Sequence, residues 1–285
     1  LVHGASVVRM WELSYRVVAE AEGEYTLGPY QVQTDTGVAT TNELVLKAGP
    51  APELEAAPLA VEASFEPAEA WEGQVVLYRY RYTTQDRGLP VEATGILAMP
   101  GHLDEDADEP WPVALLLHGY AGAWDACAPS ADDLIGPAIP ALLASQGFVV
   151  VAPDYIGMNG MGAGSTAPHA PLVGEQVAIG SWDALRAGRQ LLEGDLSHRV
   201  PGTLRDDMVI WGASQGGHAA FFVELTGPYY APEFDVAGVV AASPAHDQIS
   251  VVADAMAQYS DSSGLAALAL VGMWRWYGVP DDLQG

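Results

Sequence analysis

The residues with the clearest chemical potential are Gly212-Ala213-Ser214-Gln215-Gly216, which stand between an apolar strand pattern and a helical pattern. A serine hydroxyl is a weak nucleophile unless it is held exposed beside a base. A tight turn between a strand and a helix does this, and small flanking residues let the strand and the helix approach closely. The pattern therefore predicts that Ser214 is a nucleophile supported by Gly212 and Gly216. The simpler alternative is an ordinary glycine-rich turn.

A nucleophilic serine also needs hydrogen-bond donors for the oxyanion that forms during acyl transfer. We expect the backbone N–H of Gln215 to be one donor, helped by the positive end of the following helix. The second donor is assigned to the backbone N–H of Tyr120, in the loop His118-Gly119-Tyr120 that follows another buried strand. Gly119 allows this turn, and His118 is expected to stabilise the loop by hydrogen bonding rather than to act as the base.

These loops need a scaffold, and the sequence alternates short strand patterns with helical ones. Strands are expected near 43–47, 75–82, 91–99, 113–117, 148–152, 208–211 and 236–242, and helices over 177–193 and from Gln215 through Leu225. A broken helical pattern covers 132–146 because Pro137 and Pro140 interrupt it. Buried strands that alternate with helices predict parallel βαβ units and hence an open α/β sheet.

From about Tyr78 to Gly278 the sequence resembles the secretory lipase family of α/β-hydrolases. The motifs that carry the resemblance are His118-Gly119, Pro153-Asp154-Tyr155-Ile156-Gly157, Trp182-Asp183-Ala184-Leu185-Arg186-Ala187, the run from Gly212 to Gly217, and Tyr230-Ala231-Pro232-Glu233. The resemblance implies an α/β-hydrolase fold, which is a mostly parallel sheet with flanking helices and a helical lid. It also implies a secreted serine esterase or lipase that acts on carboxylic esters. It does not cover residues 1–60.

The chain is interpreted as two parts. Residues 1–60 are expected to form a small β-rich segment and a linker of Pro, Ala and Glu, and residues 61–285 the hydrolase domain, with the lid at about 248–285. The β-rich segment is either an immunoglobulin-like remnant or an extension that lies on the main domain. The apolar lid residues are either core packing or an acyl-binding wall.

The partners of Ser214 are harder to find in the sequence. In this fold the catalytic residues follow the order serine, acid, histidine, so Asp154 is interpreted as fixing its own loop. After Ser214, His218 is expected to face away from the serine, and His246 would act as base only if the lid folded unusually. Asp247, at the end of a strand, is a candidate acid.

We therefore expect the chain to be incomplete, with the catalytic histidine, and an acid if Asp247 is not used, beyond residue 285. The start Leu1-Val2-His3, without an initiator Met or a signal peptide, favours a processed or incomplete chain. Elsewhere, Asp183 and Arg186 stand three residues apart on one predicted helix and are expected to pair.

Composition excludes several classes of protein. With 11 Lys+Arg against 37 Asp+Glu the formal net charge is −26, which is unsuited to nucleic acid or anionic lipid. A single cysteine, Cys127, excludes an intrachain disulfide and a thiolate zinc cluster, and the longest apolar run, 265–274, is short for a bilayer span. No metal or organic cofactor is implied. The acidity and the resemblance favour a secreted or cell-envelope protein, and the expected partner is a small ester or lipid.

Two alternatives stay open alongside the esterase or lipase hypothesis. One is a catalytically silent hydrolase-fold binding module. The other is a peptidase or acyltransferase that uses the same serine.

Overall fold

The computed structural model describes residues 23–48 except 35, 36 and 41; 64–66; 74–101; 110–196 except 163–164, 166–168 and 195; 204–247; 250, 253–254 and 257; and 262–278. Contacts divide the chain into two compact units, residues 1–56 and 57–285. The predictions for residues 1–22, for the linker at 49–60 and for much of the lid, at 258–261 and 279–285, lie outside the described residues.

The first unit contains two short antiparallel ladders. Its strands are β1 (Gly23–Leu27), β2 (Gln31–Thr34), β3 (Gly37–Thr40) and β4 (Leu44–Ala48). β1 pairs with β4 and β2 pairs with β3, so the inner hairpin lies between the two outer strands along the chain. The strand expected near 43–47 is present as β4. The immunoglobulin-like interpretation stays a prediction.

The second unit is built on a seven-stranded sheet with the order β11-β10-β8-β9-β7-β6-β5. The strands are β5 (Ser64–Glu66), β6 (Val75–Asp86), β7 (Leu89–Pro100), β8 (Trp111–Leu117), β9 (Val149–Pro153), β10 (Leu204–Ala213) and β11 (Asp235–Ala242). Neighbours from β11 to β9 are parallel, and β7 is antiparallel to both β9 and β6. β6 therefore points the same way as β8 to β11, and the sheet is mostly parallel, as predicted.

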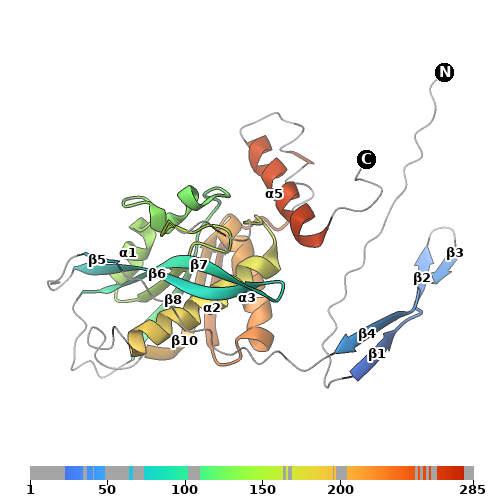
Figure 1. The fold of residues 1–285 in the computed structure, drawn as a ribbon, viewed down its shortest axis with the longest axis horizontal. Helices are drawn as coiled ribbons and strands as arrows, with labels where there is room; N and C mark the ends of the chain where they lie inside the picture. The colour runs from blue at the N-terminus through green and yellow to red at the C-terminus, as the bar shows by residue number, and fades with distance from the viewer. Residues whose placement is uncertain are drawn as a thin grey trace. The chain divides into compact units, whose positions relative to one another are not determined.

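Helices flank this sheet (Figure 1). They are α1 (Ala138–Ala144), α2 (Gly174–Glu193), α3 (Gln215–Tyr230) and α5 (Ser262–Tyr277), with 3-10 turns η1 (Asp125–Cys127) and η2 (Pro129–Ala131). The predicted end of α3 at Leu225 is wrong, because the helix continues for five residues and accommodates Pro228 in its last turn. The broken pattern at 132–146 gives only a short helix, α1. Pro137 is its N-cap, and Pro140 lies in its first turn, where a missing N–H removes no intrahelical bond.

Alternate residues of the central strands divide between two cores. Leu115 and Leu117 of β8 belong to the core that contains Trp182 of α2, whereas Leu116 belongs to the core that contains Ala144 of α1. Successive strand side chains point to opposite faces, so this division places α2 and α1 on opposite faces of the sheet. Burial on both faces is the reason that β8 and β9 read as continuous apolar runs.

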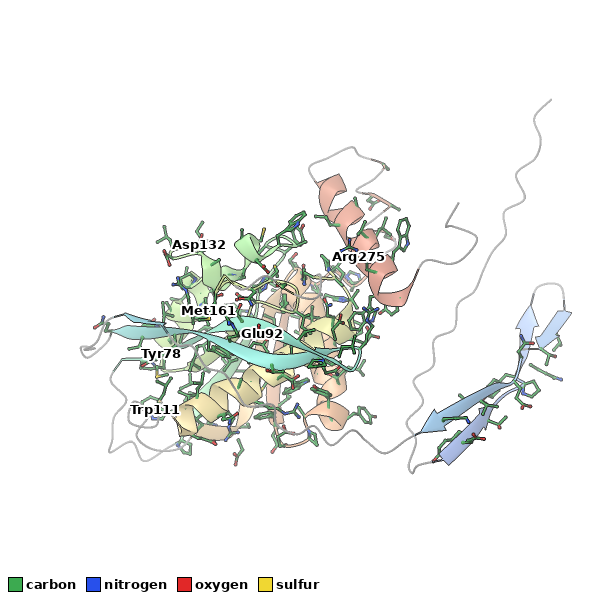
Figure 2. The ribbon with its side chains drawn as sticks, viewed as in Figure 1. Tyr78, Glu92, Trp111, Asp132, Met161 and Arg275 are labelled. Atoms are coloured by element: carbon green, nitrogen blue, oxygen red, sulfur yellow. The ribbon has the colours of Figure 1, made fainter. Side chains whose placement is uncertain are left out.

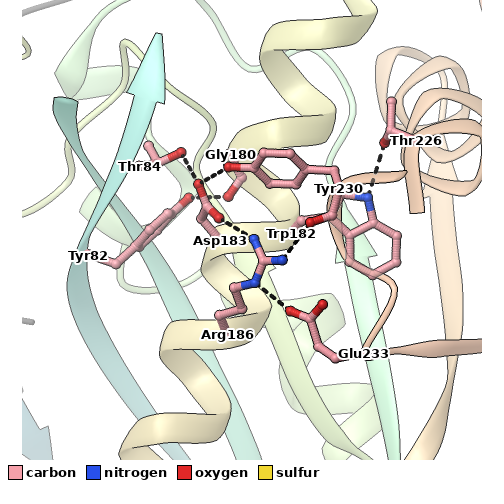
Figure 3. Close-up of polar contacts among 9 residues, drawn as sticks. All are labelled: Tyr82, Thr84, Gly180, Trp182, Asp183, Arg186, Thr226, Tyr230 and Glu233. Carbon is pink, nitrogen blue, oxygen red and sulfur yellow. Dashed lines mark hydrogen bonds and ion pairs between the residues drawn. The ribbon is translucent and has the colours of Figure 1, made fainter. Parts of the chain in front are cut away.

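Helix α2 is fastened to its neighbours by a polar cluster (Figure 3). Asp183 pairs with Arg186 at 2.9 Å, which confirms the predicted pair, and accepts hydrogen bonds from Thr84 Oγ1 at 2.7 Å and Tyr230 OH at 2.9 Å. Arg186 Nε donates in turn to Glu233 at 2.6 Å. The cluster therefore ties α2 to β6 on one side and to the end of α3 on the other.

Candidate active site

Ser214 occupies the turn between β10 and α3. Its backbone angles are φ 56° and ψ −117°, an unfavourable conformation for a residue other than glycine. Its N–H donates to the carbonyl oxygen of Ala242, at the end of β11, at 2.9 Å. The residue is exposed, and its side chain makes no capping hydrogen bond to α3. The turn thus presents the Ser214 side chain at the carboxyl end of the parallel strands.

Glycine is required on both sides of this turn because the backbone packs against itself. A Cβ atom on Gly212 would lie 2.0 Å from the carbonyl oxygen of Gly216. A Cβ atom on Gly216 would lie 2.0 Å from the carbonyl oxygen of Leu117, at the end of β8. The two glycines therefore bring β10, α3 and β8 closer together than any side chain would allow, which supports their predicted role.

The loop after β8 lies beside Ser214. A Cβ atom built on Gly119 would be 3.7 Å from the Cβ of Ser214 and 3.4 Å from the carbonyl oxygen of Ala213. Among the described residues, no acceptor takes a hydrogen bond from the N–H of Tyr120 or from that of Gln215. The first N–H groups of a helix such as α3 have no intrahelical partner. Within the described part of the chain, two backbone donors therefore have no acceptor, one beside Gly119 and one beside Ser214.

The His118 side chain binds its own loop. Its Nδ1 lies 2.6 Å from the carbonyl oxygen of Gly119, and its ring stacks on that of Tyr155 with centroids 4.1 Å apart. Tyr155 OH donates to the carbonyl oxygen of His118 at 2.9 Å. Its Nε2 lies 3.2 Å from the carbonyl oxygen of Asp154, and burial lowers the pKa of His118. These contacts support the interpretation that His118 stabilises the loop.

Asp154 joins the segment after β9 to a strand and to a 3-10 turn. Its buried carboxylate accepts hydrogen bonds from Thr94 Oγ1 at 2.6 Å, from the Ser130 N–H at 2.8 Å and from the Ser130 hydroxyl. Burial raises the pKa of Asp154, and the hydrogen bonds from Ser130 and Thr94 act in the opposite direction. The contacts link the segment after β9 to β7 and η2, which fits the predicted structural role of Asp154.

His169, which no sequence pattern singled out, is buried beside Gln215. Its Nε2 lies 3.0 Å from Gln215 Nε2, and its Nδ1 lies 3.1 Å from the carbonyl oxygen of Ile156. Its ring is parallel to that of Tyr155, with centroids 5.8 Å apart. Burial lowers the pKa of His169 to about 4. No local pattern marks a lone histidine in a loop as a neighbour of a helix that begins 46 residues later.

The candidate partners after Ser214 have other contacts. His218 Nδ1 lies 3.1 Å from the carbonyl oxygen of Ala245, and burial lowers the pKa of this histidine. His246 is exposed, with Nδ1 3.2 Å from the carbonyl oxygen of Pro244. Asp247 accepts hydrogen bonds from the N–H and the hydroxyl of Ser250 at 3.0 and 2.8 Å. Asp247 therefore stays a candidate acid.

A cleft of about 590 Å³ lies at the opposite end of β10. Its lining includes Asp206, near the start of the strand, whereas Ser214 follows the strand's last residue. Arg186 in this cleft pairs with Glu233, and Arg189 lies 3.4 Å from Asp206. The lining thus holds two arginines and three acidic residues, and the length of β10 separates it from the Ser214 turn.

The strand order, the helices on both faces and the serine turn at the carboxyl end of β10 define an α/β-hydrolase fold. A model of the secretory lipase family matches residues 134–279, which is just over half of the chain. The chain therefore belongs to the secretory lipase family. No curated protein sequence matches it.

Solved structures agree with this fold. The rice cell wall degrading esterase LipA from Xanthomonas oryzae is 25% identical in one structure, with a TM-score of 0.56 over 71% of this chain and 52% of that chain. A second LipA structure is 23% identical, with a TM-score of 0.58 over 76% of this chain and 59% of that chain. Candida antarctica lipase A in its closed state is 18% identical, with a TM-score of 0.53 over 74% of this chain and 47% of that chain. The chain thus spans about half the length of these proteins.

No helix in the part of the chain that the structure describes is both long and apolar enough to cross a bilayer. The same described residues contain no group of three or more His, Cys, Asp or Glu side chains arranged to hold a metal ion.

Proposed function

We propose that this protein is a serine-dependent carboxylic ester hydrolase that works through an acyl-enzyme on Ser214. One observation carries the proposal. In a chain of the secretory lipase family, Ser214 is exposed at a strained strand–helix turn, beside two backbone N–H groups with no acceptor among the described residues. This combination supports a nucleophile next to an oxyanion hole.

The reaction follows from these groups. Ser214 Oγ attacks the carbonyl carbon of the ester while its proton passes to a base. The N–H groups of Gln215 and Tyr120 stabilise the negative charge on the former carbonyl oxygen. The bond to the alcohol oxygen then breaks, and the alcohol takes the proton from the base. Water attacks the acyl-enzyme in the same way, releases the carboxylic acid and restores the hydroxyl of Ser214.

The base of this reaction is proposed to be a histidine outside the described residues. His118, His169 and His218 each direct Nδ1 at a backbone carbonyl, and His246 does the same at the surface. Asp247 is retained as the candidate acid, because it follows the strand β11 that neighbours β10. Without a base the serine loses several orders of magnitude in rate.

The proposed substrates are carboxylic esters, including lipid esters, and the proposed location is outside the cytoplasm. The family is named for secretory lipases, and the structural relatives are named as an esterase and a lipase. We further propose that α5 belongs to a lid, because Val271, Trp274 and Tyr277 on this helix expose apolar surface.

The test uses the whole gene product with p-nitrophenyl esters and a fluorophosphonate probe. We expect turnover and labelling in the wild type, and loss of both in Ser214→Ala. Ser145→Ala is the matched control, because Ser145 is an exposed serine at the end of α1 whose hydroxyl donates to the Leu142 carbonyl and accepts from Gln146. A wild type that is neither labelled nor active would contradict the proposal and favour the silent binding module.

A further inference from the structure

His169 is a buried side chain beside the serine turn to which the proposed reaction assigns no step. Its Nδ1 lies 3.1 Å from the carbonyl oxygen of Ile156, and its Nε2 lies 3.0 Å from Gln215 Nε2. A carbonyl oxygen only accepts, so Nδ1 carries the proton and Nε2 accepts from the Gln215 amide. These contacts assign the tautomer of His169 and the orientation of the Gln215 side chain together.

The contact with Gln215 requires a neutral His169. A second proton on the ring would occupy Nε2 and place two donors against each other. Burial lowers the pKa of His169 to about 4, and the neighbouring His118 acts in the same direction. The imidazole therefore remains an acceptor for Gln215 at neutral pH.

The Gln215 amide is not explained by stability. The residue is 2% exposed, and its Oε1 has no hydrogen-bond partner among the described residues. Burying an unpaired amide oxygen is unfavourable, and an apolar side chain of similar size would fill the space without that penalty. We therefore assign the presence of a glutamine at position 215 to the opposite end of its amide, the nitrogen that donates to His169.

Tyr155 extends the same contact to the loop after β8. Its ring stacks with those of His169 and His118, with centroids 5.8 and 4.1 Å away. Its hydroxyl donates to the His118 carbonyl at 2.9 Å, and His118 Nδ1 lies 2.6 Å from the Gly119 carbonyl oxygen. The stacked rings of His169, Tyr155 and His118 thus connect Gln215 to Gly119, the residue that precedes Tyr120.

We propose that His169 is a positioning residue for the oxyanion hole. It holds the Gln215 side chain and, through Tyr155, keeps the N–H groups of Gln215 and Tyr120 in one fixed geometry. It touches neither the ester nor Ser214. Donors that are fixed before the charge develops stabilise a transition state, and small displacements weaken them strongly. This inference rests on the proposed function.

The substitution His169→Phe tests it, because the phenyl ring keeps the stack on Tyr155 and removes the acceptor for Gln215. The whole gene product is assayed for kcat and KM with p-nitrophenyl butyrate and for the rate of labelling by a fluorophosphonate. We expect kcat and the labelling rate to fall about tenfold to hundredfold, with KM changed less than about threefold. We expect kcat to fall while KM changes little because negative charge on this oxygen develops only after the substrate has bound, as the transition state forms.

Two further variants separate positioning from general stability. Thr226 lies on α3, as Gln215 does, and its hydroxyl accepts a buried hydrogen bond of 3.1 Å from Trp182 Nε1 of α2. Thr226→Val removes this hydrogen bond. It is expected to lower Tm without changing kcat. Gln215→Met breaks the contact with His169 from the other side and is expected to lower kcat to the same extent. Because the two residues act through one contact, adding His169→Phe to Gln215→Met is expected to lower kcat no further.

The outcomes are distinct. If kcat of His169→Phe stays within about threefold of the wild type, or if the double variant is additive, the positioning role is overturned. If His169→Phe does not fold, Gln215→Met alone decides, and an unchanged kcat overturns the inference. If Ser214 is labelled in the wild type but His169→Phe behaves like Thr226→Val, the proposed function stands and this inference fails. A wild type without labelling overturns both.

Discussion

The serine turn and helix α5 lie in the same unit but are held in different ways. At the turn, backbone meets backbone, and a Cβ on Gly216 would come within 2.0 Å of the Leu117 carbonyl oxygen. Buried polar side chains then fasten the neighbouring loops. On α5, by contrast, Val271, Trp274 and Tyr277 are 43%, 46% and 65% exposed.

Helix α5 buries one face of small residues, Ala266, Ala269 and Gly272, and its other face is held by contacts at the protein surface. Arg87 Nη1, in the turn between β6 and β7, donates to the carbonyl oxygens of Arg275 and Trp276 at 3.1 Å each (Figure 2 labels Arg275). Its guanidinium lies 5.1 Å from the centre of the Trp276 ring. Tyr277 OH donates to Glu175 at 2.8 Å. Exposed contacts of this kind contribute little free energy.

The difference suits two tasks of an acyl-transfer enzyme. Donors for an oxyanion act best when they are already fixed, whereas a segment over the substrate must be able to move. Segments with few buried contacts open at low free-energy cost. We therefore propose that the turn is rigid and that α5 is the mobile part, and four predictions test this contrast.

The largest effect is expected at the close backbone packing of the turn. Gly216→Ala places a methyl group against the Leu117 carbonyl, and we expect it to lower the free energy of unfolding by about 3 kcal/mol or more. Urea unfolding measures the change. Gly238→Ala in β11 is the control, since its Cβ would meet only Val209 Cγ1, at 3.9 Å. Equal stability of the two variants would show that the turn is not tightly packed.

The second prediction concerns pH and the buried His169. Its pKa is lowered from 6.5 to about 4 by burial, so between these values the unfolded chain binds a proton that the folded protein does not. Its contribution to stability is full above pH 6.5 and is lost as pH falls towards about 4, a difference of about 3 kcal/mol.

Unfolding of the wild type and of His169→Phe between about pH 7.5 and 4.5 isolates this contribution. Burial also lowers the pKa of His118, which acts in the same direction, and raises that of Asp154, which acts in the opposite one. His118 and Asp154 are present in both the wild type and His169→Phe, so the difference between the two stability curves reports the contribution of His169. Parallel stability curves would mean that His169 is not buried in its neutral form.

The third prediction concerns the attachment of α5. Arg87→Gln removes the guanidinium that bonds the Arg275 and Trp276 carbonyls, and we expect amide hydrogen exchange in α5 to become about fivefold faster. Exchange at α3 is expected to stay unchanged. Arg205→Gln, which breaks an exposed pair with Asp207, is the control. Unchanged exchange in α5 would show that the helix is held by other contacts.

The smallest effect is expected within α5 itself. A Cβ atom on Gly264 would meet nothing within 4 Å, so Gly264→Ala is expected to stabilise the helix by about 0.4–1 kcal/mol. Thermal unfolding measures this change, and a lower Tm would mean that the helix is packed more tightly than its exposure suggests. Gly216→Ala and Gly264→Ala are thus the same substitution with opposite expected signs.

The sequence predicts the parts of the fold that depend on local patterns. The buried strands β8 and β9 and the turn at Ser214 follow from apolar runs and a glycine pattern, which the structure contains at those places. His169 was missed because its partners, Ile156 and Gln215, are set by the packing of separate loops. The end of α3 was missed because the tolerance of Pro228 depends on its place in the last turn.

The most direct test of the account is to locate a fluorophosphonate adduct by peptide mass spectrometry in the whole gene product. We predict one adduct, on the peptide that contains Ser214, and none in Ser214→Ala. An adduct on another serine, or an unmodified Ser214 in a folded and fully probed protein, would contradict the claim that this turn presents the nucleophile.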